Sequence, residues 1–85
     1  MSSIKQLLLK VHALVPDVCK DNRQYSFTKE LIDNSEPELT IEMFLELADE
    51  TQEIFPPEYW ELLAEAGRKM KIMDIDNLIR IYKKS

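Results

Sequence analysis

The sequence predicts an all-α fold, in which residues 1–85 form a single compact bundle of four to five short helices. Leu, Glu, Lys and Ile are abundant and favour helix, whereas one Gly and four Pro leave few positions for tight β-hairpins. Apolar residues recur at spacings of three and four, which is the period of one helix face. With 45% hydrophobic and 32% charged residues, the chain has the composition of one globular domain.

Two helices are expected before residue 35. The first begins after Ser3, a good N-cap residue, and continues to about Val15, because Pro16 stops it. The second is expected between about residues 21 and 33. Its inward-facing residues are predicted to be Tyr25, Thr28, Leu31 and Ile32.

The third helix has a clear start signal. Ser35 followed by Glu38 matches a capping box, and Pro37 suits the first helical turn because its missing N–H has no partner to lose there. The apolar pattern continues to Ala48. We expect the helix to end within residues 50–52.

A fourth helix is expected from Pro57 to about Lys71. Basic residues in its last turns favour the negative end of the helix dipole. Gly67 lies inside this helix, where the absence of a Cβ atom allows a neighbouring helix to approach closely.

A short fifth helix is expected near the C-terminus. Asp74 or Asp76 can cap it, and it continues through Tyr82. Its predicted buried residues are Ile75, Leu78, Ile79 and Tyr82. Lys83 and Lys84 close it, where positive charge is favourable.

The residue types that catalysis or metal binding requires are scarce. His12 and Cys19 are the only histidine and cysteine, and Pro16 lies between them, so neither a catalytic pair nor a zinc site follows. We interpret His12 as a surface residue of the first helix and Cys19 as a small packing residue. We therefore expect no enzymatic activity, no cofactor and no metal.

Charge and cysteine content indicate the cellular setting. A net charge of −5 and a pI near 4.8 disfavour direct binding to nucleic acid or to an anionic membrane. No run of about 20 uncharged residues could span a bilayer. Cys19 has no second cysteine to pair with, and charged residues interrupt the first apolar run, so we expect a cytoplasmic protein. A monomeric state is compatible with this interpretation.

The acidic residues are concentrated in one segment. From Glu30 to Glu65 the chain has twelve acidic residues and no Lys or Arg, whereas all eleven basic residues lie outside. Six acids share a sector of about 120° on the third helix, at 100° per residue: Glu38, Glu42, Glu46, Asp49, Glu50 and Glu53. Glutamates four residues apart destabilise a helix by roughly 0.2 to 0.5 kcal/mol per pair. A surface of one sign favours encounter with a basic partner, so we expect this ridge to bind a protein.

The fourth helix is predicted to extend the acidic surface. Glu58, Glu61 and Glu65 share its outer side, whereas Tyr59 falls on the inner side and Trp60 at the margin. Trp60 is either a core residue or an interface anchor. The residues predicted to contact a partner are Glu42, Glu46, Asp49, Glu50, Glu53, Glu58, Tyr59, Trp60 and Glu61.

Residues 30–47, 57–63 and 66–70 resemble the MafI-type immunity proteins of bacterial polymorphic-toxin and contact-dependent inhibition systems. The acidic turn Ser35-Glu36-Pro37-Glu38 and the late Gly67-x-x-Met70 carry the resemblance. It implies a small helical cytosolic protein that binds the C-terminal effector domain of a toxin, and many such effectors are nucleases. The sequence departs from the family pattern in its Phe55-Pro56-Pro57 loop and in residues 76–82.

The leading hypothesis is an immunity protein that neutralises a basic toxin domain, because a nuclease needs a basic groove for phosphates. The alternative is a helical adaptor or regulatory domain outside toxin systems, self-associating through Trp60 and the Phe55 loop. An enzyme is the third option, for which the usual acid, base and nucleophile are missing.

Overall fold

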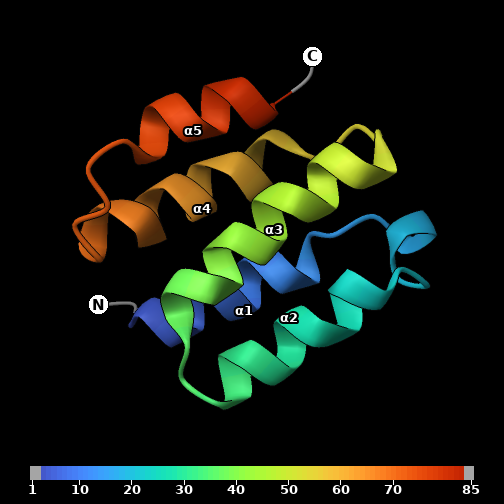
Figure 1. The fold of residues 1–85 in the computed structure, drawn as a ribbon, viewed down its shortest axis with the longest axis horizontal. Helices are drawn as coiled ribbons and strands as arrows, with labels where there is room; N and C mark the ends of the chain where they lie inside the picture. Colours follow the sequence, from blue (N-terminus) through green and yellow to red (C-terminus); the bar gives the residue numbers. More distant parts are fainter. Residues whose placement is uncertain (1–2, 84–85) are drawn as a thin grey trace.

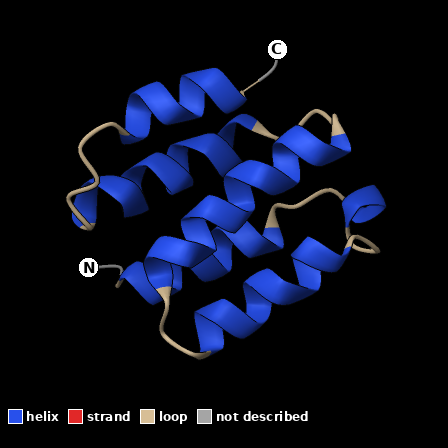
Figure 2. Ribbon diagram, in the orientation of Figure 1, coloured by secondary structure: helices blue, strands red, loops and turns tan. Residues whose placement is uncertain are grey.

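Five α-helices build the fold in a computed structural model that describes residues 3–83 (Figure 1). The helices are α1 (Ile4–Ala13), α2 (Arg23–Asp33), α3 (Pro37–Thr51), α4 (Pro57–Lys69) and α5 (Ile75–Tyr82), with a 3₁₀ turn η1 (Asp17–Cys19) after α1. Helices and loops account for all the described residues, and Figure 2 shows no strand among them. The predicted all-α bundle is confirmed.

The helices pack as two pairs and a fifth element. Helix α1 packs mainly against α4, and α2 packs mainly against α3, while α5 contacts both α3 and α4. Figure 1 shows α3 crossing in front of α1, with α2 and α5 along opposite edges of the molecule. Helix α3 therefore lies between α2 and α5, and its outer side borders both.

An aromatic cluster joins α4 to α3 at the centre of the core. The Tyr59 ring meets Phe44 edge-on at 5.9 Å and packs against Phe55 at 4.6 Å and Trp60 at 5.1 Å. The Tyr59 hydroxyl donates a hydrogen bond to the Phe44 carbonyl at 2.7 Å. Burial raises the pKa of Tyr59 well above its ordinary value, so the phenol stays neutral and keeps its proton for this bond.

The first helix begins as predicted and ends earlier. Ser3 is its N-cap, and with Gln6 it forms a capping box. The helix ends at Ala13 rather than near Val15, because the chain must leave the helical conformation before Pro16.

The predicted capping box at the start of α3 is wrong. Ser35 has a φ of 57° and ends α2 in a Schellman motif, in which its N–H donates to Ile32 and the Glu36 N–H donates to Leu31. Its side chain is therefore not the cap of α3. That helix begins at Pro37 and ends at Thr51, within the expected range.

Helices α4 and α5 are held close together at Gly67, as predicted. A Cβ atom built on Gly67 would lie 2.3 Å from Cγ1 of Ile75. Helix α4 ends at Lys69, two residues early, because Lys71 adopts a φ of 60° and turns the chain. Asp74 is the N-cap of α5, but its side chain makes no cap hydrogen bond.

Most of the buried residues expected in the second and fifth helices are found. Thr28, Leu31 and Ile32 are buried, and so are Ile75 and Ile79. The remaining three are only partly buried: Tyr25, Leu78 and Tyr82. Lys83 is the C-cap of α5, and Lys84 lies outside the described residues.

Cys19 is buried in the core as expected, whereas His12, predicted at the surface, is half-buried. The His12 ring stacks on Tyr25 with centroids 4.4 Å apart, and its Nε2 is buried without a hydrogen-bond partner in the described part of the chain. Burial lowers the pKa of His12, and Lys29 and Lys20 lower it further against the opposing effect of Asp33. His12 thus joins α1 to α2 in its neutral form.

Candidate protein-binding site

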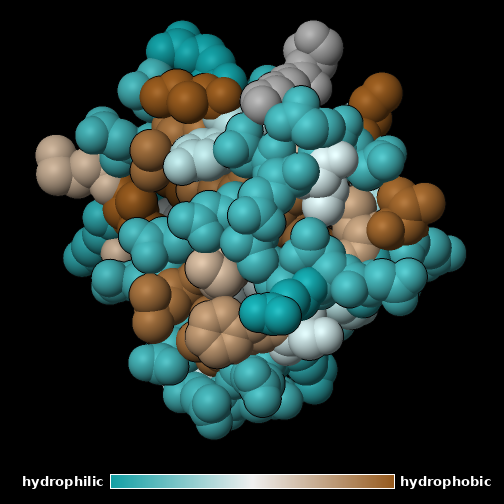
Figure 3. Space-filling model, turned by 45° about the vertical axis from the view of Figure 1, so that its right-hand side comes forward, coloured by the Kyte–Doolittle hydropathy of each residue, from teal (hydrophilic) through white to brown (hydrophobic). Residues whose placement is uncertain are grey.

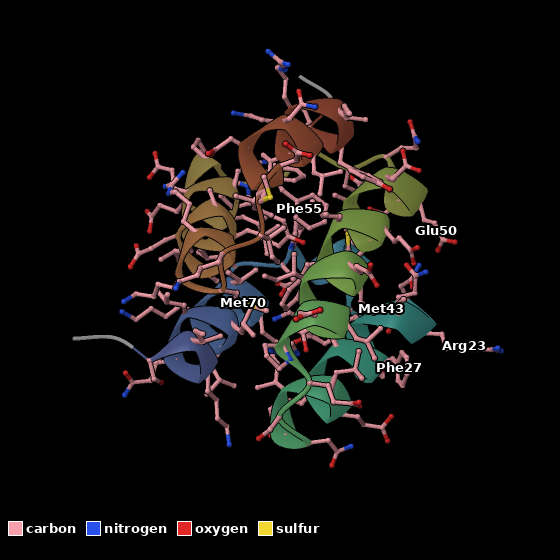
Figure 4. All side chains as sticks on the ribbon, turned by 60° about the vertical axis from the view of Figure 1, so that its left-hand side comes forward. Arg23, Phe27, Met43, Glu50, Phe55 and Met70 are labelled. Carbon is pink, nitrogen blue, oxygen red and sulfur yellow. The ribbon has the colours of Figure 1, made fainter. Side chains whose placement is uncertain are left out.

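The outer side of α3 forms an acidic face made of Glu42, Glu46 and Glu50. These three glutamates lie on consecutive turns and are exposed, whereas Phe44 and Leu47 on the other side of the helix are buried. Figure 4 shows Glu50 pointing outward from α3, while Phe55 points into the interior. The predicted amphipathic arrangement of this helix is therefore present.

The glutamates of the acidic face form no ion pair with the cations of the described residues. Within residues 3–83 the ion pairs join Lys20 to Asp17, Lys29 to Asp33 and Arg68 to Asp76, at 3.0, 3.1 and 2.7 Å. None of them involves Glu42, Glu46 or Glu50. The three glutamates thus present their charge to solvent, where a basic surface could reach them.

Asp49 and Glu53 differ from these three residues. Asp49 is half-buried and interacts within the chain, and its carbonyl also accepts a hydrogen bond from the Gln52 side chain at 2.6 Å. Glu53 is exposed but follows the end of α3, in the loop that leads to α4. Glu53 therefore extends the acidic face beyond the helix, and Asp49 lies at its edge.

Two hollows border the acidic face where α3 meets α5. The first has a volume of about 210 Å³ and the second about 360 Å³. The first is lined by Glu42, Leu45, Glu46, Leu78 and Tyr82. The second is lined by Ala48, Gln52, Glu53, Ile54, Phe55, Pro57, Trp60, Tyr82 and Lys83. Tyr82 lines both, so the two hollows adjoin, and we call them together the α3/α5 groove.

A third hollow lies on the other side of α3, against α2. It has a volume of about 360 Å³ and contains Phe27, Met43 and Arg23 among its lining residues. Figure 4 shows Phe27 beside Met43, with Arg23 extending away from the protein. Figure 3 shows that apolar patches on one side of the molecule are separated by hydrophilic side chains. No single large apolar patch dominates the surface in this view.

Tyr59 and Trp60 do not lie on the exposed surface as partner contacts would. Tyr59 is fully buried, and its hydroxyl is already bonded to Phe44. Trp60 is only 6% exposed, although it lines the second hollow. The structure therefore corrects the prediction that Tyr59 contacts a partner and leaves Trp60 as part of the groove floor.

Glu61 and Glu65 of α4 do not extend the acidic face as predicted. Glu58, Glu61 and Glu65 are exposed. Glu61 and Glu65, however, lie on the side of α4 opposite Tyr59, because successive residues turn by 100°. Since Tyr59 points toward α3, these two carboxylates point away from it. The predicted set of contact residues is thus divided between two helix faces.

Three groove residues are not among the contact residues predicted from the sequence: Leu45, Ile54 and Tyr82. Ile54 is 86% exposed although it is strongly apolar, and it sits between Glu53 and the buried Phe55. Its place in a loop between two helices is the one feature of the sequence that could have indicated a contact residue. Leu45 and Tyr82 could not be assigned to a groove before the packing of α5 was known.

Residues 3–83 contain no group of three or more His, Cys, Asp or Glu side chains that could hold a metal ion. None of the helices in this part of the chain combines the length and the apolar character needed to cross a bilayer. No protein-family model, curated protein or solved structure matches the chain. The resemblance to MafI-type immunity proteins therefore stays a prediction from the sequence.

Proposed function

We propose that this chain binds a basic protein and neutralises it, in the way that an immunity protein blocks the effector domain of its cognate toxin. The observation that carries the proposal is the acidic face of α3, where Glu42, Glu46 and Glu50 are exposed and form none of the ion pairs found in residues 3–83. Glutamates at this spacing repel one another along the helix. The positive charges of a basic partner would attract these carboxylates and offset their mutual repulsion.

A nuclease domain is the partner class that this charge pattern suits best. A nuclease needs a positively charged groove for phosphates, and an acidic helix can occupy such a groove in place of the substrate. Complementary charge also accelerates association, which favours rapid capture of a toxic protein. The expected inhibitor acts by covering the partner's surface.

The proposal is tested by co-expression with the product of the adjacent gene and by matched charge reversals. Glu46→Lys with Glu50→Lys changes the acidic face, and Glu61→Lys with Glu65→Lys changes α4. Both variants alter the net charge equally and place the reversed residues four apart. We expect the α3 variant to lose at least about tenfold in affinity and the α4 variant less than about threefold.

Cell protection and affinity are measured together in this experiment. Equal losses for the two variants would mean that only net charge matters and would contradict a specific role for α3. Full affinity and full protection in the α3 variant would refute the acidic face as the binding site.

A second candidate function is an adaptor domain outside toxin systems. Exposed apolar side chains favour it, since Ile54, Met73 and Ile81 are 86%, 95% and 64% exposed. A toxin-domain gene beside this one would favour the inhibitor. An unrelated neighbourhood together with concentration-dependent self-association would favour the adaptor.

A further inference from the structure

The α3/α5 groove combines an apolar floor with an acidic wall. Leu45 and Trp60 are 4% and 6% exposed and form part of the floor, while Ile54 stands exposed in the loop at one end. Tyr82 connects the two hollows from the α5 side. An apolar side chain that enters from outside would cover surfaces that solvent now reaches.

The carboxylates along the groove come from the α3 side. Glu42 and Glu46 line the first hollow, and Glu53 lines the second. Among the described residues that line the two hollows, the one basic residue is Lys83, the C-cap of α5. Excess negative charge beside an apolar floor is complementary to a segment that is basic on one side and apolar on the other.

The length of the groove suits a short helix. From Glu42 to the end of α3 at Thr51 the helix rises by about 14 Å, at about 1.5 Å per residue, and the loop to Ile54 adds to this. About three turns of a helix have the same length. On such a helix, residues spaced by three and four share one face, so apolar anchors and cations can be separated cleanly.

We propose that the α3/α5 groove docks a basic amphipathic helix of the partner protein, whose apolar residues seat against Trp60, Tyr82 and Ile54. The Lys and Arg residues of that helix pair with Glu42, Glu46 and Glu53. This inference rests on the proposed function and specifies the partner element that the acidic face binds. The hollow between α2 and α3 is less suited to a basic helix, because its charged lining residues are one arginine and one glutamate, Arg23 and Glu30. The α3/α5 groove has three glutamates and one lysine among its lining residues.

Trp60 supplies a direct test, because it is the only tryptophan and lines the groove. The probe is a synthetic peptide of about 14 residues, with Leu spaced by three and four and Lys elsewhere. A scrambled peptide of identical composition is the control. We expect the amphipathic peptide to bind at least about tenfold more tightly and to shift both the Trp60 emission and its indole N–H resonance.

Matched substitutions locate the peptide. Ile54→Ser removes an exposed apolar side chain in the groove, whereas Met73→Ser removes a similarly exposed one outside it. We expect Ile54→Ser to weaken binding by about five- to tenfold and Met73→Ser to leave it unchanged. Both residues are exposed and lie in loops, so neither substitution should impair folding. A difference in peptide affinity between the two variants would therefore reflect the groove.

Three results would refute the proposal that a basic helix docks in the groove. They are equal binding of the scrambled peptide, saturating binding without a Trp60 signal, and a Trp60 shift that depends on protein concentration without peptide. The last would identify a second copy of the chain as the occupant. If the adjacent gene product binds through Glu46 and Glu50 without changing the Trp60 signals, docking in the groove is refuted and the proposed function is retained. If neither that product nor the peptide binds, the proposed function fails as well.

Discussion

The outer faces of α3 and α4 carry glutamates at the same spacing, but their surroundings differ. The last turn of α3 contains no basic residue, whereas α4 ends with Arg68 and Lys69, and Arg68 pairs with Asp76 at 2.7 Å. Two acidic residues of α3 also line a hollow with an apolar floor. A run of glutamates in the sequence is therefore not by itself a binding surface.

Helices with similar glutamate spacing can thus have different surroundings once they are packed in the fold. On α3, exposed glutamates outside the ion pairs of residues 3–83 occur together with an adjacent hollow. On α4, basic residues of the same helix reduce the field over its last turns. We therefore assign partner binding to α3 and use α4 as its internal control.

The largest expected effect comes from Gly67→Ala, because the α3/α5 groove requires α5 to stay against both α3 and α4. An added Cβ would lie 2.3 Å from Cγ1 and 2.9 Å from Cβ of Ile75, and the Cβ atom cannot move away without a shift of α5. Alanine gains helix propensity over glycine, but the overlap outweighs that gain. We expect the free energy of unfolding to fall by about 1 to 3 kcal/mol in urea denaturation.

A double-mutant cycle with Ile75→Ala serves as the control for this prediction. Ile75→Ala alone should destabilise the protein, because it empties a buried site. In the Gly67→Ala background the same change relieves the overlap, so it should cost less. Strict additivity of the two effects would contradict the close contact between α4 and α5.

An intermediate effect on stability is expected from lowering the pH. The contribution of His12 to this effect must be known before the glutamates of α3 and α4 are compared. Burial lowers the pKa of His12 in the folded protein, so the unfolded chain takes up this proton more readily than the folded one as the pH falls below about 6.5. Stability due to neutral His12 is thus complete above that pH and is lost below it. In His12→Phe, which keeps a ring against Tyr25, the loss between pH 7 and pH 5.5 should be smaller.

Thermal unfolding of both proteins at these two pH values checks this prediction. His12 is the only histidine, so no second imidazole contributes to the difference. An equal decrease in Tm for wild type and His12→Phe would show that His12 is not its source. The α3 and α4 variants are then best compared in the His12→Phe background.

The helices could be predicted from the sequence because prolines and caps mark them locally. Pro16, Pro37 and Pro57 lie where a helix ends or begins, and the bounds differ from the structure by about two residues. Ser35 was misassigned because Ser both caps helices and, in this chain, adopts the left-handed conformation after one. Local sequence alone does not distinguish these roles.

The candidate site could be predicted only in part. The rotation of each helix follows from its own apolar stripe, which placed Glu42, Glu46 and Glu50 correctly on the surface. The relative positions of helices do not follow from such stripes. For that reason the α4 glutamates were expected beside α3, and the groove with Ile54 and Tyr82 was not foreseen.

The smallest effect tests the electrostatic contrast in the free protein. Glu50→Gln removes the repulsion with Glu46 one turn earlier, and we expect it to stabilise the chain by roughly 0.2 to 0.5 kcal/mol at low salt. Glu65→Gln removes repulsion with Glu61 but also loses attraction to Lys69, so its net effect should be close to zero. Paired urea denaturation curves at low and high salt measure both changes. Stabilisation by Glu50→Gln that persists in high salt would not be electrostatic, because salt screens exposed charges, and equal gains at both sites would remove the contrast between α3 and α4.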